Sequence, residues 1–311
     1  MKREPAMVPE AEPRSYHGQP VIKEPVWTWE VPWYLFAGGM AGTSTGVAFL
    51  AETRGNNPLA RRSWLLALGG VGAGTGLLIS DLGKPSRFLN MLRVVKVTSP
   101  MSVGSWLLMA TGAATSVAAV HSWTGALEGA ARVAKPAAAL LGLPISTYTA
   151  ALVANTAVPV WHEARLTLPF LFAAGAAISA GAAGAVVTPP RYAGPSRRLA
   201  VAGAVAETVA SKLMEQRLGE LGSPYHEGQA GRLNRISEVL TVAGGLLLAS
   251  FGRRRNAAIA SGGLLLAGAA AKRWAVFKAG VQSAADPAQT VGPQRRRISE
   301  GRVRGAERLA V

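Results

Sequence analysis

Cysteine is absent from the 311-residue sequence, so the chain can form no disulfide and cannot ligate an iron–sulfur cluster through thiolates. Histidine is scarce, with 4 copies, at positions 17, 121, 162 and 226. A transmembrane b-type haem needs paired histidines on facing helices, and only His121 lies near the end of an apolar run. We therefore expect no haem, no iron–sulfur cluster and no metal in this chain, and any electrons it handles must come from a partner.

Charged residues are also few, at 16% of the chain, whereas soluble domains contain about a quarter. Hydrophobic residues make up 49%, and eight apolar runs are about long enough to cross a ~30 Å hydrocarbon core. The sequence predicts an all-α integral membrane protein, a bundle of about eight transmembrane helices. Seven is the alternative, because the sixth and eighth runs are the weakest. The runs are residues 32–53, 63–82, 102–122, 136–157, 166–187, 198–214, 236–252 and 257–274.

Polar segments flank this helical region. Residues 1–30 are rich in glutamate and proline and contain no apolar stretch typical of a secretory signal peptide, which predicts a mostly disordered N-terminal tail up to about Lys23. Residues 31–275 form the expected transmembrane domain. Residues 276–311 form a basic C-terminal tail.

The net charge of +16 comes from 33 Lys and Arg that lie mostly between the apolar runs. Cations at these places meet anionic lipid headgroups, so we expect membrane lipids as partners and no nucleic acid. With eight spans both termini share one side. That side holds more cations, which favours cytoplasmic termini, but the excess shrinks when only residues close to the spans are counted.

The stretch "WTWEVPWY" leads into the first run. Glu30, Tyr34, Gly38, Gly42 and Gly46 follow at intervals of four, which places them along one stripe of a helix. Small residues at this spacing let two helix backbones approach closely, so the stripe should face protein. Glu30 and Tyr34 should then point toward the bundle interior near one membrane surface.

Aspartate occurs twice, and Asp81 is the one that lies at a membrane boundary, since Asp286 is in the C-terminal tail. The cationic segment that follows, residues 84–96, carries apolar residues such as Phe88 and Leu92 at helical spacing. This pattern predicts a short amphipathic helix in the interface, with an ordinary cationic loop as the alternative.

Three motifs, "WTWEVPWYLFAGGMAG", "KPSRF" and "TSPMSVGSW", stand in this order between residues 27 and 106. In motif and spacing the chain resembles the polysulfide reductase membrane-subunit family, also called NrfD/PsrC-like, best over residues 27–161. The resemblance implies an eight-helix subunit of the bacterial cytoplasmic membrane without its own cofactor. Such a subunit binds a quinone, with menaquinone expected here. It docks an iron–sulfur subunit, which serves a molybdopterin-type subunit such as a formate dehydrogenase or a polysulfide or thiosulfate reductase.

The resemblance also implies site residues. Tyr34 stands where the family has a quinone-contacting histidine, and Asp81 stands at the position of the acidic residue that ends the second helix. The family's pocket tyrosine falls near Leu143, where this sequence departs, and Tyr148 is a possible substitute. Tyrosine can donate a hydrogen bond to a quinone carbonyl, but it is a poor proton carrier near neutral pH.

Alternating helix directions should bring the start of the first run, the end of the second, the start of the third and the end of the fourth to one face. We expect the residues that act on the quinone to be Asp81, Tyr34 and Glu30. Further quinone contacts are expected from Trp29, Ser99, Trp106, Tyr148, Asn155 and His162. For the tryptophans, which all lie near span ends, an aromatic belt at the membrane surface is the plainer interpretation.

A second function class stays open at this point. A membrane transporter or a passive scaffold could use the intramembrane acidic residues Asp81, Glu207 and Glu52. Glu207 could alternatively pair with Lys212 or Arg198 near a helix end. A transporter usually shows inverted repeats with interrupted helices, and the two halves of this sequence show no convincing repeat.

Overall fold

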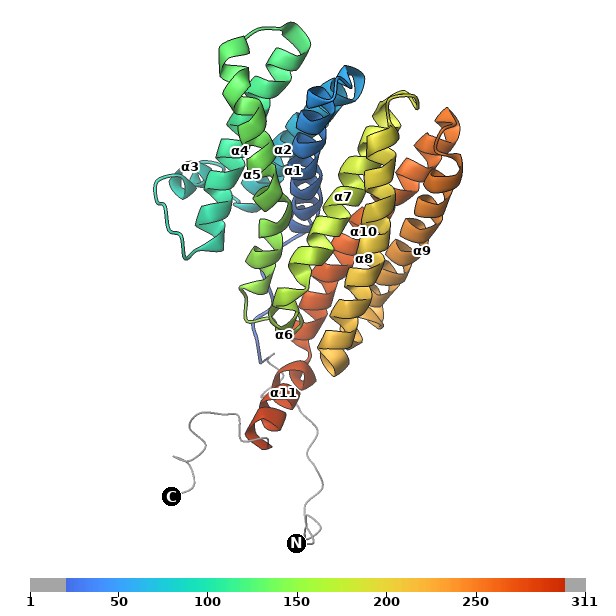
Figure 1. Cartoon of the computed structure of the whole chain (residues 1–311). Helices are drawn as coiled ribbons and strands as arrows, with labels where there is room; N and C mark the ends of the chain where they lie inside the picture. Colours follow the sequence, from blue (N-terminus) through green and yellow to red (C-terminus); the bar gives the residue numbers. More distant parts are fainter. Residues whose placement is uncertain (1–20, 300–311) are drawn as a thin grey trace, which may run out of the picture.

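The computed structural model describes residues 21–299, and this part of the chain is helical throughout, with short connections (Figure 1). Residues 1–20 and 300–311, which hold part of each predicted tail, lie outside the described residues. Helices of 20 residues or more occupy the places of all eight apolar runs. They are α1 (Glu30–Thr53), α2 (Asn57–Asp81), α4 (Pro100–Thr124), α5 (Glu128–Ala154), α7 (Leu168–Val187), α8 (Gly194–Leu218), α9 (Gly228–Phe251) and α10 (Arg255–Ala285).

Short helices fill the connections. They are α3 (Arg87–Met91), α6 (Pro159–Glu163), the 3₁₀ helices η2 (Ala164–Leu166) and η3 (Gly219–Tyr225), and α11 (Pro287–Ser299). The predicted interfacial helix within residues 84–96 is thus reduced to the five residues of α3. By contrast, α10 continues ten residues beyond position 275, where the sequence analysis ended the helical domain, and buries Val276, Phe277 and Ala279.

Four of the described helices, α2, α4, α5 and α7, are long and apolar enough to cross a membrane. The prediction of an all-helical membrane protein is confirmed at this level. That all eight long helices cross the bilayer stays a prediction, since α8, α9 and α10 carry ionisable side chains along their length.

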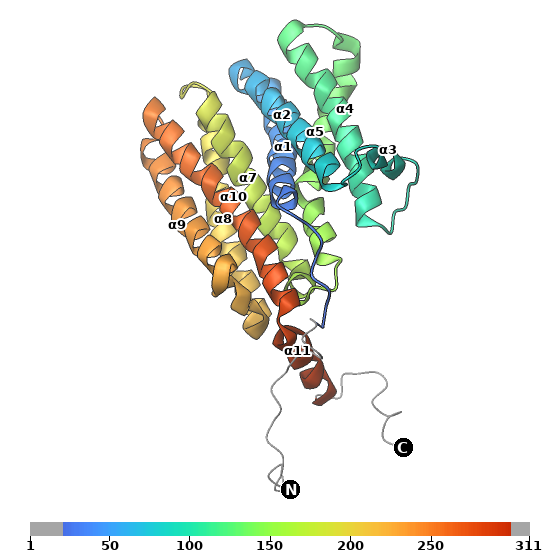
Figure 2. The same ribbon diagram turned by 180° about the vertical axis from the view of Figure 1, so that it is seen from behind.

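Consecutive long helices run in opposite directions and pack side by side, as α1 with α2, α4 with α5, α7 with α8 and α9 with α10 (Figures 1 and 2). Helix α1 also contacts α5, α7 and α10, so it joins the two sides of the bundle. Short turns close each pair at one end. The start of α1, α6, η3 and α11 lie at the other end, which we call the α6 end.

Local sequence explains where helices begin. The side chains of Asn56 and Ser99 each accept a hydrogen bond from the backbone N–H three residues on, at 3.4 Å in both cases. Each is followed by a proline in the first turn, Pro58 or Pro100, where a missing N–H costs nothing. These caps fix the starts of α2 and α4.

In the glycine stripe of α1, one position requires glycine because two helices pack closely there. A Cβ on Gly42 would lie 2.5 Å from the carbonyl oxygen of Gly142 in α5, so a larger residue there would push the two helices apart. A Cβ on Gly38 or Gly46 would meet no atom within 4 Å. The prediction that the stripe faces protein is therefore confirmed for Gly38 and Gly42, which are buried, and of the three glycines Gly42 is the one where a side chain would clash.

Two tryptophans are not part of an aromatic belt. Trp64 and Trp161 are 0% exposed, and the Trp64 indole donates a hydrogen bond of 3.2 Å to Glu52 Oε2. Trp29 and Trp123, in contrast, are exposed as a belt residue would be. The belt interpretation is wrong for the two buried indoles, because their N–H groups find partners inside the bundle.

Candidate functional site

Two tyrosines meet in the half of the bundle formed by α1, α2, α4 and α5. The rings of Tyr34 on α1 and Tyr148 on α5 have centroids 6.5 Å apart and are nearly perpendicular. Gly104 on α4 lies against the Tyr148 ring, and a Cβ on Gly74 of α2 would lie 3.6 Å from the Tyr34 ring. Four helices thus contribute to this tyrosine pair, and glycines provide the room for its rings.

Tyr34 is the more enclosed of the two, at 5% exposure. Within residues 21–299 its hydroxyl has no hydrogen-bond partner. One turn further along α1, Gly38 is buried but has open space where a Cβ would lie. A phenol with spare donor capacity is suited to donating a hydrogen bond to a carbonyl group.

Acidic residues lie near the same end of these helices. Glu30 accepts hydrogen bonds from the hydroxyl of Thr28 and, at 3.3 Å, from that of Ser80. The second of these bonds ties the start of α1 to the end of α2. Asp81, the next residue, is half-buried and ends α2. Glu30 and Asp81 therefore form an acidic rim that is accessible to solvent.

The predicted residues of α4 have structural partners. Ser99 caps the helix, as described above, and the indole of Trp106 donates a hydrogen bond of 3.4 Å to the carbonyl of Val94. Ser102 also donates to this carbonyl, at 2.9 Å. These bonds hold the loop after α3 against the first turns of α4, and any quinone contact by Ser99 or Trp106 stays a prediction.

The remaining predicted residues lie at the α6 end. Asn155 is exposed at the C-terminus of α5, and His162 is exposed on α6, where it borders a cavity of about 510 Å³ beneath α11. Beside His162, the Trp161 indole stacks on Trp27 with centroids 5.7 Å apart and donates to the carbonyl of Val276 at 2.8 Å. Trp29, two residues from Trp27, is 56% exposed. The predicted set therefore divides into three groups: the tyrosine pair with its acidic rim, Ser99 and Trp106 at the start of α4, and the remaining residues at the α6 end.

Buried ionisable residues lie on the opposite side of the bundle, and of these the sequence pointed to Glu207 but not to Lys272 or Arg273. Glu207 on α8 is buried, as expected of an intramembrane acid, but the charges that face it are Lys272 and Arg273 of α10. Pairing with Arg198 is thus not what the structure shows. In the sequence, the buried cations are indicated by the dipeptide Lys272-Arg273, which lies inside an otherwise apolar run.

The described residues do not bring together a set of side chains that could ligate a metal ion. Among residues 21–299, no group of three or more His, Asp or Glu side chains is placed to hold a metal ion. The hydroxyl and carboxyl groups described above can donate hydrogen bonds and exchange protons with water.

Fold and site together define an all-helical membrane protein in which tyrosine and carboxyl groups gather near one end of the bundle. The model of the polysulphide reductase NrfD family matches residues 17–217. The chain belongs to this family, whose members are quinone-interacting membrane subunits of respiratory oxidoreductase complexes and typically partner with iron–sulfur and molybdopterin subunits. The resemblance found in the sequence is thereby confirmed. A comparison with the curated proteins gives no match.

Proposed function

We propose that this chain is the quinone-reactive membrane subunit of a respiratory oxidoreductase, exchanging electrons between a docked iron–sulfur subunit and the menaquinone pool. The observation that carries the proposal is the enclosed Tyr34–Tyr148 pair, 6.5 Å between ring centroids, next to the acidic rim of Glu30 and Asp81. The pair lies within the segment that matches the family.

Each residue has a role that its chemistry allows. Tyr34 and Tyr148 donate hydrogen bonds to the quinone carbonyl oxygens and orient the ring. Reduction of a quinone takes up two protons with two electrons, and Asp81, at the half-buried end of α2, passes protons from water. Glu30 holds Ser80, and thus the end of α2, in place.

The proposed setting follows from the family and the helix arrangement. All eight long helices cross the bacterial cytoplasmic membrane. The described ends of the chain lie together at the α6 end, with the termini assigned to the cytoplasm from the cation count. A docked iron–sulfur subunit supplies electrons there, because this sequence has no cysteine for a cluster of its own. A molybdopterin-type subunit, of the formate dehydrogenase or polysulfide/thiosulfate reductase kind, completes the complex.

The test is electron transfer in the purified complex. Tyr34→Phe should weaken binding of a menaquinone analogue about fivefold, the loss of one hydrogen bond of about 1 kcal/mol. Asp81→Asn should lower the rate of electron transfer to the analogue by about 100-fold while leaving its binding nearly unchanged. Tyr192→Phe and Asp286→Asn are the matched controls, since both residues lie outside the site.

If both site variants match the controls in rate and affinity, the site assignment is wrong. If the chain purifies alone and carries a solute across liposome membranes, the subunit proposal fails in favour of a transporter. The acids considered for transport do not share one path. Asp81 is in the acidic rim, Glu207 lies against α10, and Glu52 forms an ion pair with Lys135 near the opposite end of α1.

A further inference from the structure

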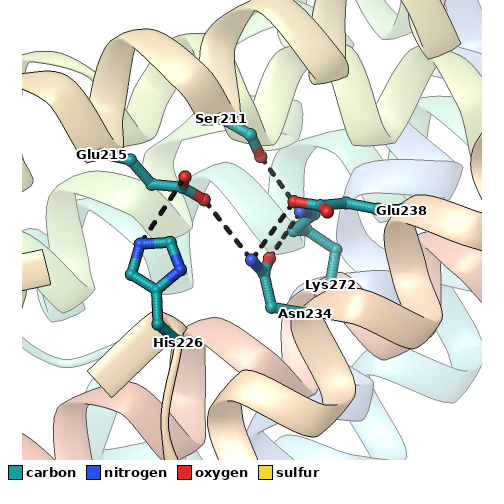
Figure 3. A network of polar contacts seen from close by, with 6 residues as sticks. All are labelled: Ser211, Glu215, His226, Asn234, Glu238 and Lys272. Carbon is teal, nitrogen blue, oxygen red and sulfur yellow. Dashed lines mark hydrogen bonds and ion pairs between the residues drawn. The ribbon is translucent and has the colours of Figure 1, made fainter. Parts of the chain in front are cut away.

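A chain of polar contacts runs through α8, α9 and α10, on the side of the bundle away from the tyrosine pair. Its centre is Lys272, which is 2% exposed. The Lys272 amino group donates hydrogen bonds to Ser211 Oγ at 3.0 Å and to Asn234 Oδ1 at 2.7 Å (Figure 3). A buried ammonium group with two neutral acceptors needs negative charge nearby.

That negative charge lies on both sides of Lys272. The Asn234 amide donates to Glu238 Oε1 at 3.2 Å and, toward the α6 end, to Glu215 Oε1 at 3.4 Å. Glu215 in turn lies 3.8 Å from Nε2 of His226, which is exposed (Figure 3). These contacts form a continuous link from the interior to the solvent-facing end of the bundle.

On the inner side of Lys272 lies Glu207, which is also 2% exposed. Its Oε2 atom has no hydrogen-bond partner within the described residues. Arg273 lies close by, because a Cβ added to Gly175 of α7 would be 2.8 Å from Glu207 Oε2 and 3.1 Å from Arg273 Nη2. Arg273 itself donates to the carbonyl of Phe172 at 2.8 Å. A buried carboxylate with a vacant acceptor is costly and calls for an explanation.

A cavity of about 200 Å³ connects this carboxyl group with the surface of the bundle. Glu207 and Lys272 border it from the inside, and the exposed side chains of Glu238 and Lys212 border it from the outside. The space exceeds the ~30 Å³ that one water occupies, and its polar walls offer the partners that ordered water needs. Water there links Glu238 to Glu207 without using the Asn234 amide, which does not release protons readily.

The helices around Glu207 contribute the following charged side chains. Helix α10 supplies Lys272 and Arg273, α9 supplies Glu238 across the cavity, and α8 itself supplies Lys212. Helix α7 has no ionisable side chain. Two buried cations thus surround one buried carboxyl group, and proton exchange at that group changes the net charge of the interior by one unit.

We infer that Glu207 is a proton-accepting site, filled from water at the α6 end through Glu215, Glu238 and the cavity. In the loading step a hydronium ion beside Glu215, at the α6 end, releases a proton, Glu238 and water in the cavity relay it, and the Glu207 carboxylate becomes a carboxylic acid. Unloading reverses the step, and no electron moves. The route runs through α8, α9 and α10, whereas the tyrosine pair lies on α1 and α5, so it is a feature separate from the quinone site.

The experiment is a pH jump on the purified full-length protein, followed by infrared absorption of the carboxylic acid group. In the wild type, acidification should produce a carboxylic acid band that Glu207→Gln removes and Glu207→Asp shifts. Glu238→Gln should keep the band but slow its appearance by roughly tenfold, because the proton loses the relay residue between Glu215 and the cavity. Glu128→Gln, which removes an exposed carboxyl group at the opposite end, is the matched control and should change neither result.

The readout needs no quinone, so it can fail or succeed independently of the proposed function. If Glu207→Gln does not yield folded protein, the shift with Glu207→Asp and the slowing with Glu238→Gln still test the assignment. A band that neither Glu207 variant alters, or one that appears as fast in Glu238→Gln as in the wild type, would overturn the inference. In that case Glu207, Lys272 and Arg273 are an ion cluster that serves packing alone.

Discussion

The two sides of this bundle are built on different physical principles. Around Tyr34, helices α1, α2, α4 and α5 meet through glycines and aromatic rings. Between α8, α9 and α10, the interior contains Glu207, Lys272 and Arg273, each 2% exposed. The first side depends on shape, whereas the second depends on charge balance, since a buried charge is tolerated only when other groups compensate it. Substitutions should therefore act on the two sides in different ways.

The largest effect should come from Lys272→Met. The variant keeps the volume of the side chain but removes the cation that faces Glu207 and the donor to Ser211 and Asn234. Breaking such a buried charge arrangement costs about 3–5 kcal/mol, which thermal unfolding of the detergent-solubilised protein would detect. Lys278→Met on the same helix is the control, with a change within about 0.5 kcal/mol. Equal stability of the two variants would mean that the charge balance is unimportant.

The corresponding change on the other side is Gly42→Ala. The added methyl group would overlap Ile145 and lie 2.5 Å from the carbonyl oxygen of Gly142, which should lower the free energy of unfolding by about 1–3 kcal/mol. Gly46→Ala meets open space and should be neutral or stabilising by up to about 1 kcal/mol, because alanine favours helix. Thermal unfolding of the detergent-solubilised protein measures both effects. A loss of stability in Gly46→Ala as large as in Gly42→Ala would contradict the importance of the α1–α5 contact.

Much of the shape-dependent side could be predicted from sequence. The apolar runs predict eight long helices, which are present among the described residues, and the structure adds that Asn56 and Ser99, each followed closely by proline, cap two of their starts. The family resemblance places Tyr34 at the quinone site and offers Tyr148 as a substitute for the pocket tyrosine, and the two rings meet. These features depend on local pattern and on helix direction, both of which a single sequence reveals.

The charge-dependent side could not be predicted in the same way. Lys272 finds its acceptors 61 and 38 residues away, on two other helices, and no local spacing indicates which faces meet. The last apolar run ends at Trp274, although α10 continues to Ala285. Likewise, Trp161 looked like a surface residue because its partner, the Val276 carbonyl, lies on a distant helix.

A smaller effect, which sharpens the contrast, is expected for Tyr34→Phe. Because the hydroxyl has no partner within residues 21–299, its removal should change the free energy of unfolding by less than about 0.5 kcal/mol. Binding of the menaquinone analogue should still weaken, as proposed above. Measured together, stability and affinity separate a ligand contact from a packing contact. A clear loss of stability without a change in affinity would assign Tyr34 to the core alone.

The smallest effect should come from the exposed ion pair of Arg132 and Glu128 on α5. The two charged groups are 2.7 Å apart at i,i+4 spacing, and their side chains are 76% and 68% exposed. Water screens such a pair, so Arg132→Gln should change the free energy of unfolding by at most about 0.5 kcal/mol, and less in high salt. The measurement is the thermal unfolding used for Lys272→Met, at low and high salt. Because both variants remove one cation, the difference between them isolates the effect of burial. If Arg132→Gln and Lys272→Met lowered the free energy of unfolding by comparable amounts, the interior between α8 and α10 would be as accessible to water as the bundle surface.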